Sequence, residues 1–373
     1  MQFIDLEAQR KRLGEPLEAS ILKVVRSGKY ILGPEIDELE TALARFCGAP
    51  YAMTCANGTD ALVLLMMIKG VKPGDAVLVP SYTYAATGEA VVWLGAEPVF
   101  VDVDEHTFNM DPQSLRAGIR VARARGLRPV GVIPVDLFGL PADYDSLDPI
   151  VAEHGLWSLC DTAQGFGATY KSRRTGAIGD CASTSFFPAK PLGCYGDGGA
   201  VFVRTKEELD LLKSLRVHGQ GVDKYDNVRL GMNGRMDTMQ AAVLLHKLAI
   251  FEDEIVARDR IAKRYSAALA DVATVPIVPN GCSSVWAQYT LRVPAEKRET
   301  LIAALAADGI PTAVYYRFPM HRQTAYKHYA VAGDGLPVSD RLSRECVSLP
   351  MHPYLDEATQ DRICARVRSA LAS

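Results

Sequence analysis

The sequence has no long apolar run, no segment dominated by charge of one sign and no leader-like beginning. No stretch approaches the roughly 18 uninterrupted apolar residues that a membrane-spanning helix needs. The formal net charge is only −3 over 373 residues, so no basic field favours nucleic acid or an anionic membrane surface. Acidic residues come early, at Asp5 and Glu7, which is unlike a signal peptide. We therefore expect a cytoplasmic protein that binds neither nucleic acid nor membrane.

Cysteine, histidine and glycine are present, but not in the spacings of redox, metal or nucleotide motifs. The eight cysteines form no Cys-x-x-Cys pair and mostly have small or apolar neighbours, so we expect reduced, buried side chains. The seven histidines show no metal-ligand spacing, and no metal site is predicted. The glycines of 165–167 and 193–199 do not match Gly-x-Gly-x-x-Gly, and no Gly-x-x-x-x-Gly-Lys-Ser/Thr occurs. A Rossmann dehydrogenase or a P-loop kinase therefore lacks its fingerprint.

What is present is ordinary globular composition, with 48% hydrophobic and 23% charged residues, enough for a large core. Short β-rich runs alternate with helical patterns along the first 250 residues. The predicted strands are 76–80, 97–103, 129–135, 156–161 and 199–203, and the predicted helices are 59–68, 87–94, 111–123 and 145–153. Apolar strands that alternate with helices favour an α/β fold with a large, mainly parallel sheet. Ligands of such sheets bind at the carboxyl ends of the strands.

The last third of the chain has a different pattern. A long helical pattern over 239–267 comes first, as expected for a helix that passes from one domain to the next. Predicted strands over 286–293 and 312–316 then mix with predicted helices over 295–308 and 356–371. The sequence thus predicts a large α/β domain over residues 1–250 and a small α+β domain over residues 251–373.

Lys190 is the most informative single residue. It lies in an apolar stretch, Ser185–Pro191, just before a glycine-dense turn, whereas an isolated lysine is most often a solvated surface charge. Asp161 ends a predicted strand about thirty residues upstream, and Gln164 follows one helical turn later. Alone, Asp161 is as readily a turn or capping residue. Together, the amine can form a Schiff base with an aldehyde, and the carboxylate can keep a pyridine nitrogen protonated, which is the chemistry of pyridoxal 5′-phosphate (PLP) enzymes.

Other motifs suit the phosphate and ring of such a cofactor. Gly58 and Thr59 open a predicted helix, where free N–H groups and a hydroxyl can hold phosphate, although a plain helix cap is the commoner explanation. Ser185 could add a further hydroxyl. Tyr84 follows a strand end, where its ring can stack on a cofactor, although tyrosines more often belong to the core. Asn233 lies on a glycine-flanked loop of the kind that often binds ligands.

In combination these motifs resemble the nucleotide-sugar aminotransferases of the DegT/DnrJ/EryC1/StrS family, which are fold-type I PLP enzymes similar in fold to aspartate aminotransferase. The resemblance covers essentially the whole chain. It is carried by residues 27–28, 33–34, 57–62, 80–87, 161–164, 185–190, 196–200 and 233–236. Two departures are Phe187, where many relatives have His, and Asp197, where many have Glu. Neither touches the core chemistry, although Phe187 would alter the pocket near the amino donor.

The resemblance implies a role for each matched residue. Lys190 should carry the Schiff base, Asp161 should pair with the pyridinium nitrogen, and Gln164 should lie beside the ring. Gly58, Thr59 and Ser185 should hold the phosphate, and Tyr84 should stack on the ring. Asn233 should reach the phosphate of the neighbouring subunit, which implies an obligatory homodimer with composite active sites. L-Glutamate is the implied amino donor.

One branch of the family fits best. Residues 30–35, 186–199 and 348–354 resemble enzymes that aminate C3 of a UDP-2-acetamido-3-keto-hexuronic acid for O-antigen (lipopolysaccharide) diamino-uronic sugars. The substrate-binding residues implied are Tyr30, Arg229, Tyr316 and Arg317, with Arg317 and then Arg229 for the sugar carboxylate.

Two alternatives stay open. One is a same-family aminotransferase acting on a 4-keto-6-deoxy sugar or a dTDP-3-keto-6-deoxy sugar. The other is a non-catalytic, PLP-binding regulatory homologue, against which Lys190, Asp161 and Gln164 argue. The sugar dehydratases of the family carry histidine in place of the Schiff-base lysine, so Lys190 argues against that activity.

Overall fold

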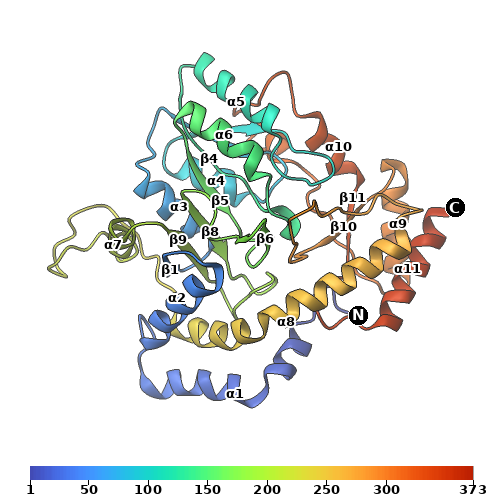
Figure 1. The fold of residues 1–373 in the computed structure, drawn as a ribbon, viewed down its shortest axis with the longest axis horizontal. Coiled ribbons are helices and arrows are strands. Elements are labelled where there is room, and N and C mark those ends of the chain that lie inside the picture. Colours follow the sequence, from blue (N-terminus) through green and yellow to red (C-terminus); the bar gives the residue numbers. More distant parts are fainter. Residues whose placement is uncertain (373) are drawn as a thin grey trace.

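A seven-stranded sheet forms the centre of the computed structural model, which describes residues 1–372 (Figure 1). Its strands lie in the order β1-β9-β8-β5-β4-β2-β3. Only β9 runs antiparallel to its neighbours, β1 and β8, and the other pairings are parallel. The predicted α/β fold with a mainly parallel sheet is thereby confirmed. The bounds are β1 (Tyr51–Cys55), β2 (Asp75–Pro80), β3 (Glu97–Val101), β4 (Arg128–Val132), β5 (Trp157–Asp161), β8 (Cys181–Ser185) and β9 (Gly199–Val203).

Helices cover both faces of this sheet, so strands such as β2 and β9 are buried on both sides. That explains why their sequences are apolar without alternation. The helices between strands are α3 (Gly58–Ile68), α4 (Ala86–Trp93), α5 (Pro112–Ala124), α6 (Tyr144–His154) and α7 (Lys206–Leu215). The start of α5 shows the local signal clearly: the Asp111 side chain accepts from the Ser114 N–H at 2.6 Å, and Pro112 occupies the first turn.

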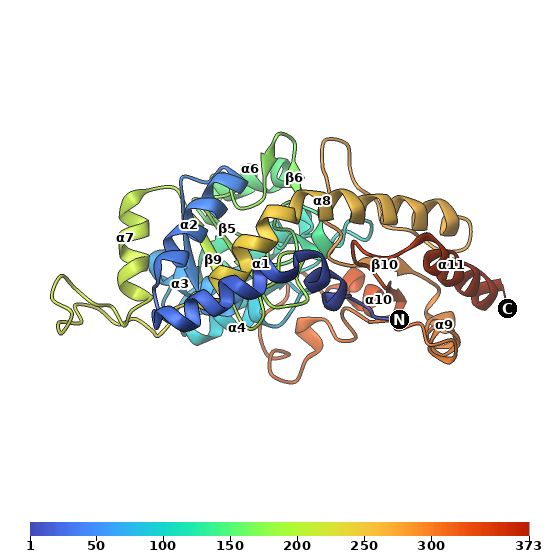
Figure 2. The ribbon, with the colours of Figure 1, turned by 90° about the horizontal axis from the view of Figure 1, so that it is seen from below.

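A 32-residue helix, α8 (Thr238–Leu269), runs from the sheet toward the C-terminal part of the molecule (Figures 1 and 2). Two N-terminal helices that the sequence patterns did not predict, α1 (Leu6–Ser27) and α2 (Pro34–Cys47), pack against α8. Helix α1 bends at Gly14, whose φ is 60°, and buries Leu17 and Val24. The pair of helices closes one side of the sheet domain.

The C-terminal part is a smaller layer of strands and helices with a second apolar cluster. It contains β10 (Tyr289–Arg292) antiparallel to β11 (Cys346–Leu349), with α9 (Ala295–Ala307), α10 (Pro337–Glu345) and α11 (Glu357–Ala372). The short elements of the chain are β6 (Thr169–Tyr170), β7 (Arg173–Arg174), η1 (Leu137–Gly139) and η2 (Met320–Arg322). The second cluster begins on α8 at Ile261, whereas Phe251 still belongs to the main core. The predicted domain limit at 250/251 thus falls inside α8, and it stays a prediction.

The predicted strand over 312–316 is wrong. Only Ala313 pairs there, as an isolated bridge to Ser348. The chain then leaves the sheet, because the Tyr316 N–H donates to the Tyr82 hydroxyl at 3.1 Å instead of to a neighbouring strand. This departure brings residues of the C-terminal part to the end of β2.

The structure also bears on the other expectations from composition. All eight cysteines are free, and only Cys282 is not fully buried. Along residues 1–372 no helix combines the length and the apolar character needed to cross a membrane.

Candidate active site

The residues singled out in the sequence gather at the carboxyl ends of adjacent strands. Asp161 is the last residue of β5 and Ser185 the last of β8, and these two strands are neighbours in the sheet. Ser81 and Tyr82 follow the end of β2, two strands away. In a parallel sheet these ends share one edge, where ligands of doubly wound folds bind. The topology therefore assembles the site that the separate motifs suggested.

Asp161 is a buried carboxylate with three compensating groups. Its Oδ1 accepts the Ala163 N–H at 3.0 Å and its Oδ2 accepts the Thr87 hydroxyl at 3.3 Å. Burial raises the pKa of Asp161, while the Ala163 N–H, the charge of Lys190 and the Thr87 hydroxyl act in the opposite direction. Such a group can face a protonated ring nitrogen, because a cationic partner would favour its ionised form further.

Lys190 projects from the turn after β8 toward the same region. Its backbone N–H donates to the Phe187 carbonyl at 2.8 Å. On the other side of the turn, the Phe186 N–H donates to the Gly198 carbonyl at 2.7 Å, and the two bonds order the loop. Desolvation lowers the pKa of the Lys190 amine, and the nearby charge of Asp161 opposes this. An amine that loses its proton more readily than in water is suited to attack an aldehyde and to move protons.

The start of α3 forms a cradle in which no side chain would fit. A Cβ at Gly58 would lie 2.6 Å from the Ser185 Cβ, so the helix start and the end of β8 are in direct contact. Asn57 caps the helix by accepting the Asp60 N–H at 2.8 Å. The N–H groups of Gly58 and Thr59 belong to the first turn, which has no intrahelical acceptors. Together with the Ser185 hydroxyl, this helix end fits a phosphate group.

Gln164 connects the sheet end to the C-terminal part. Its side-chain oxygen accepts the Phe138 N–H at 2.8 Å, and its amide donates to the Tyr316 hydroxyl at 3.0 Å. Tyr82 contacts the same segment: its hydroxyl donates to the Tyr315 carbonyl at 2.5 Å and accepts the Tyr316 backbone N–H at 3.1 Å. Tyr316 is thus brought to the predicted cofactor residues from more than 150 positions away.

Two residues at the site were given no role from sequence. Thr87, on α4, donates its hydroxyl to Asp161. It belongs to the motif 80–87, but no role was predicted for it from the sequence.

Asp136 is fully buried one strand away, and its N–H donates to the Asp161 carbonyl at 3.0 Å. Its Oδ1 accepts the Tyr144 hydroxyl at 2.6 Å, whereas its Oδ2 has no partner. Burial raises the pKa of Asp136 to about 7. The sequence feature that could have indicated Asp136 is its position as a polar residue directly after the mostly apolar run 130–135.

Four other predicted residues lie at the surface of this chain. Tyr84 is 60% exposed. Tyr30 is exposed, and its carbonyl accepts the Thr238 N–H at 2.8 Å, which places it beside the start of α8. Asn233 is exposed and accepts from the Arg235 side chain at 3.0 Å. Arg317 is more than half exposed, with Glu299 3.8 Å away.

Arg229 lies on a projecting segment, residues 218–231, which we call the arm (Figure 1). The arm leaves the end of α7 and stands away from the body of the molecule in both views (Figures 1 and 2). It exposes a set of apolar side chains: Val222, Tyr225, Val228 and Leu230. Arg229 itself donates to the Ser214 hydroxyl at the base of the arm.

Within residues 1–372, no three His, Cys, Asp or Glu side chains lie close enough together to hold a metal ion.

Comparison with known proteins gives a consistent result. The sequence profile of the DegT/DnrJ/EryC1/StrS aminotransferase family matches residues 12–368. A UDP-2-acetamido-2-deoxy-3-oxo-D-glucuronate aminotransferase from Pseudomonas aeruginosa is 46% identical over 366 residues, which cover 98% of this chain and 99% of that protein.

Solved structures agree over the whole chain. A DegT DnrJ EryC1 StrS aminotransferase from Brucella abortus superposes with a TM-score of 0.98 at 53% identity, and each chain is covered fully. NtdA from Bacillus subtilis with the bound cofactor PMP, the amine form of PLP, superposes with a TM-score of 0.89 at 26% identity, over 100% of this chain and 83% of that one. These likenesses confirm the predicted fold-type I architecture.

Proposed function

The chain belongs to the DegT/DnrJ/EryC1/StrS aminotransferase family, and from this premise we propose that it moves an amino group from L-glutamate to C3 of a UDP-2-acetamido-2-deoxy-3-keto-hexuronic acid. It is a PLP-dependent sugar aminotransferase. The observation that carries the reaction type is the placement of Lys190 near the buried carboxylate of Asp161, beside the Gly58–Ser185 cradle. The 46% identity to the Pseudomonas aeruginosa enzyme supports the sugar.

The residues of the site fit PLP from end to end. Gly58, Thr59 and Ser185 would hold its phosphate, and Asp161 would keep its ring nitrogen protonated. Gln164 would lie beside the ring, and Tyr84 would stack on the exposed face. When bound, PLP supplies an aldehyde that condenses with primary amines and a pyridinium ring that accepts electrons.

Lys190 would perform the proton transfers. Its Nζ would hold the aldehyde in the absence of substrate, and after displacement by an amino donor the free amine would remove the proton from the α-carbon of the donor. The lowered pKa of Lys190 favours this, because a larger fraction of the amine is unprotonated near neutral pH. In the second half of the cycle the same amine would deliver a proton to C3 of the sugar.

The sugar carboxylate calls for a cation. We assign Arg317, because it follows Tyr316, whose hydroxyl contacts Gln164, and because its contact with Glu299 at 3.8 Å is loose and exposed. Tyr316 would border the sugar on the same side. Arg229 and Tyr30 remain further candidates, and the arm would carry Arg229 to a neighbouring subunit.

A homodimer with composite sites is part of the proposal. The arm exposes Leu230 by 91% and Tyr225 by 82%, which is costly for apolar side chains unless a partner covers them. Asn233 follows the arm and is exposed as well. A second copy that covers the arm would bring Asn233 to the phosphate bound by the other subunit. We further propose that the enzyme acts in the cytoplasm and serves O-antigen synthesis.

The proposal is tested by the absorption spectrum of the purified, PLP-loaded protein. We expect a yellow protein whose visible band disappears with L-glutamate and returns when the UDP-2-acetamido-3-keto-hexuronic acid is added. Product should form with C3 aminated, as shown by mass spectrometry and NMR. In Lys190→Ala, which keeps the cradle and Asp161, we expect bound cofactor whose visible band can shift with glutamate but is not lost on the time scale of turnover, because the amine that would move the proton is absent.

Each departure from this result has a defined meaning. Bleaching by glutamate without return would reject the sugar and favour a 4-keto-6-deoxy or a dTDP-3-keto-6-deoxy acceptor. Failure of every amino donor to bleach the band would support the non-catalytic regulatory alternative. Full turnover by Lys190→Ala would contradict the role given to that residue.

A further inference from the structure

Ser81, the first residue after β2, is bound on two sides by a segment of the C-terminal part. Its hydroxyl lies 2.7 Å from Nδ1 of His321 and also accepts the His321 backbone N–H at 3.2 Å. Its carbonyl accepts the Met320 N–H at 2.8 Å. Ser81 is fully buried and His321 is 9% exposed. This junction therefore joins the end of β2 to η2 through buried groups.

One placement of the protons gives the Ser81 hydrogen an acceptor. In it the Ser81 oxygen accepts the His321 backbone N–H, and the Ser81 hydroxyl donates to Nδ1 of the ring. His321 then carries its proton on Nε2, which faces Asp340 Oδ1 at 3.3 Å. Nε2 and the Asp340 carboxylate are close, but they form no well-aligned hydrogen bond. The orientation of the His321 ring therefore depends more on the 2.7 Å contact of Nδ1 with Ser81. A neutral imidazole is the form in which Nδ1 accepts the Ser81 hydrogen.

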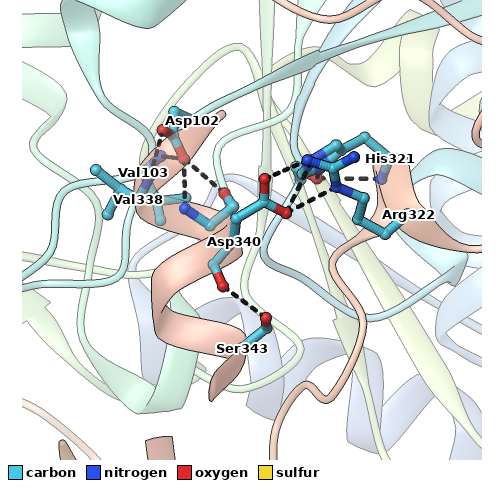
Figure 3. Close-up of polar contacts among 9 residues, drawn as sticks. Asp102, Val103, His321, Arg322, Val338, Asp340 and Ser343 are labelled. Carbon is cyan, nitrogen blue, oxygen red and sulfur yellow. Dashed lines mark hydrogen bonds and ion pairs between the residues drawn. The ribbon is translucent and has the colours of Figure 1, made fainter. Parts of the chain in front are cut away.

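Asp340 is held by its own partners on α10 and η2 (Figure 3). Arg322 donates two hydrogen bonds to it, from Nε at 2.9 Å and Nη2 at 2.5 Å. The start of α10 is in turn bound by Asp102, at the end of β3, which accepts the Val338 N–H at 2.9 Å and the Ser339 N–H at 2.8 Å (Figure 3). Asp102, α10, Asp340 and Arg322 are thus connected by hydrogen bonds, and the 3.3 Å contact of Asp340 with His321 continues this series toward the end of β2.

The segment that begins at Ser81 carries residues of the active site. Tyr82 contacts Tyr316, and Tyr84 is the predicted stacking residue. Thr83 and Thr87 share a hydrogen bond at 3.2 Å, and Thr87 donates to Asp161. A displacement of Ser81 would therefore move groups on both sides of the cofactor position.

We propose that His321 is a positioning residue for transamination: as a neutral imidazole it fixes Ser81 and so sets the segment 81–87 against Asp161. It is not part of a Ser-His-Asp nucleophile, because the Ser81 hydroxyl is fully buried and its hydrogen bonds to His321 are both structural. The inference rests on the PLP aminotransferase chemistry of the family and is independent of the identity of the sugar.

The same geometry predicts an effect of acid. A proton on Nδ1 would turn the acceptor of the Ser81 hydroxyl into a second donor, so the Ser81 hydrogen would lose its partner. Burial lowers the pKa of His321, as does the charge of Arg322, whereas Asp340 and Asp102 act to raise it. Lys327 and Asp334 also line the open cavity of about 700 Å³ that His321 borders. Activity should therefore decline only at pH values below the usual titration range of histidine.

Paired variants test this. His321→Asn keeps an acceptor near the Nδ1 position but cannot titrate, whereas His321→Gln places its amide near Nε2 and leaves Ser81 without an acceptor. Ser81→Ala removes the hydroxyl itself. His328→Asn changes an exposed histidine of the neighbouring turn and is the control. The measurements are PLP affinity from fluorescence titration of the apoprotein, kcat and KM from pH 5 to 9, and the imidazole ¹⁵N spectrum.

We expect His321→Gln and Ser81→Ala to lose about tenfold in kcat/KM and in PLP affinity, as for the loss of a buried hydrogen bond. His321→Asn should stay within about twofold of the parent at pH 8 and lack its acid limb. The imidazole ¹⁵N signals present in the parent and absent from His321→Asn belong to His321. Their chemical shifts should be those of a neutral ring with its proton on Nε2.

An Nδ1–H tautomer, an unchanged acid limb in His321→Asn, or PLP affinity unaffected in both His321→Gln and Ser81→Ala would overturn the proposal. If His321→Gln does not fold, Ser81→Ala carries the same test. A parent protein inactive with glutamate and the keto-uronate would count against those substrates only, because PLP affinity and the tautomer are measured without them.

Discussion

At the scale of single residues, the buried carboxylates of Asp161 and Asp136, which lie close together at one end of the sheet, have different hydrogen-bond partners and neighbouring charges. Asp161 has an N–H, a hydroxyl and the charge of Lys190 to stabilise its ionised form. Asp136 has the Tyr144 hydroxyl and the Ala142 N–H on one oxygen and nothing on the other, and its pKa rises to about 7. Burial raises the pKa of both carboxylates, but only at Asp161 does a nearby cation, Lys190, oppose this rise.

Asp136 therefore gives a pH-dependent stability with a definite sign. Its folded pKa lies above the value of about 3.9 expected in the unfolded chain, so its contribution to stability is lost as pH rises from about 4 to about 7. Asp136→Asn, which keeps an acceptor for Tyr144, should match the parent near pH 4.5. At pH 8 it should be more stable, by an amount on the order of a few kcal/mol.

The measurement is urea unfolding of the two proteins at several pH values, with exposed Asp37→Asn as the control. A difference between Asp136→Asn and the parent that does not change with pH would contradict the assignment.

At the scale of elements, the start of α3 depends on a glycine for reasons of space and not of backbone conformation. A methyl group on Gly58 would meet the Ser185 side chain and would separate the helix from the end of β8. Overpacking of this kind costs about 1–3 kcal/mol. The strain falls on the phosphate position, so we expect Gly58→Ala to weaken PLP binding at least tenfold.

A double-variant cycle with Ser185→Gly separates the clash from other effects. With the serine side chain removed, the additional loss caused by Gly58→Ala should shrink to less than about threefold. Dissociation constants for PLP from equilibrium titration give the cycle, and strictly additive losses would show that the contact with Ser185 is not the cause.

Elements could be predicted where the pattern of apolar residues was strong. The strands β2, β3, β5 and β9 and the helices α3 to α6 were found within a few residues, because apolar runs and helical periodicity agree there. β8 was missed because its sequence, Cys181–Ser185, is small and polar in type although buried. α1 was missed because Gly14 and Pro16 interrupt its pattern.

The candidate site was accessible from sequence only in part. Asp161 ends a predicted strand, and Gln164 follows it by three residues. Ser185 and Lys190 are five residues apart in the chain. The topology of a parallel sheet then explains why the two pairs meet at one edge. The contacts of Ser81 with His321 and of Gln164 with Tyr316 span 240 and 152 residues. No local pattern encodes such pairings, because they depend on how the C-terminal part docks.

At the scale of the whole molecule, the arm is the feature that a single chain does not explain. Its apolar residues Val222, Tyr225, Val228 and Leu230 are exposed. The arm also carries Arg229, a candidate for the sugar carboxylate, and it is followed by Asn233, which was expected to reach the phosphate of a neighbouring subunit. The proposed dimer resolves this by burying the arm against a second copy.

Replacing the apolar side chains of the arm should therefore weaken the dimer. We expect Tyr225→Ser combined with Leu230→Ser to raise the dimer dissociation constant at least tenfold, in line with the loss of central apolar contacts at an interface. Val256→Ser, at a 69% exposed position on α8, is the matched control. Sedimentation velocity over a range of concentrations gives the constants. A parent protein that is monomeric at micromolar concentration would contradict the dimer itself.

The docking of residues 313–322 onto the end of β2 also has a consequence for how the protein is made. A ribosome has completed Lys190, Asp161 and the phosphate cradle when little more than half of the chain has been synthesised. The partners of Ser81, Tyr82 and Gln164 emerge much later, with Tyr316 and His321. A nascent or prematurely terminated chain therefore contains the reactive amine without the groups that order its surroundings, and the native geometry of the cofactor site can form only after those groups have been synthesised.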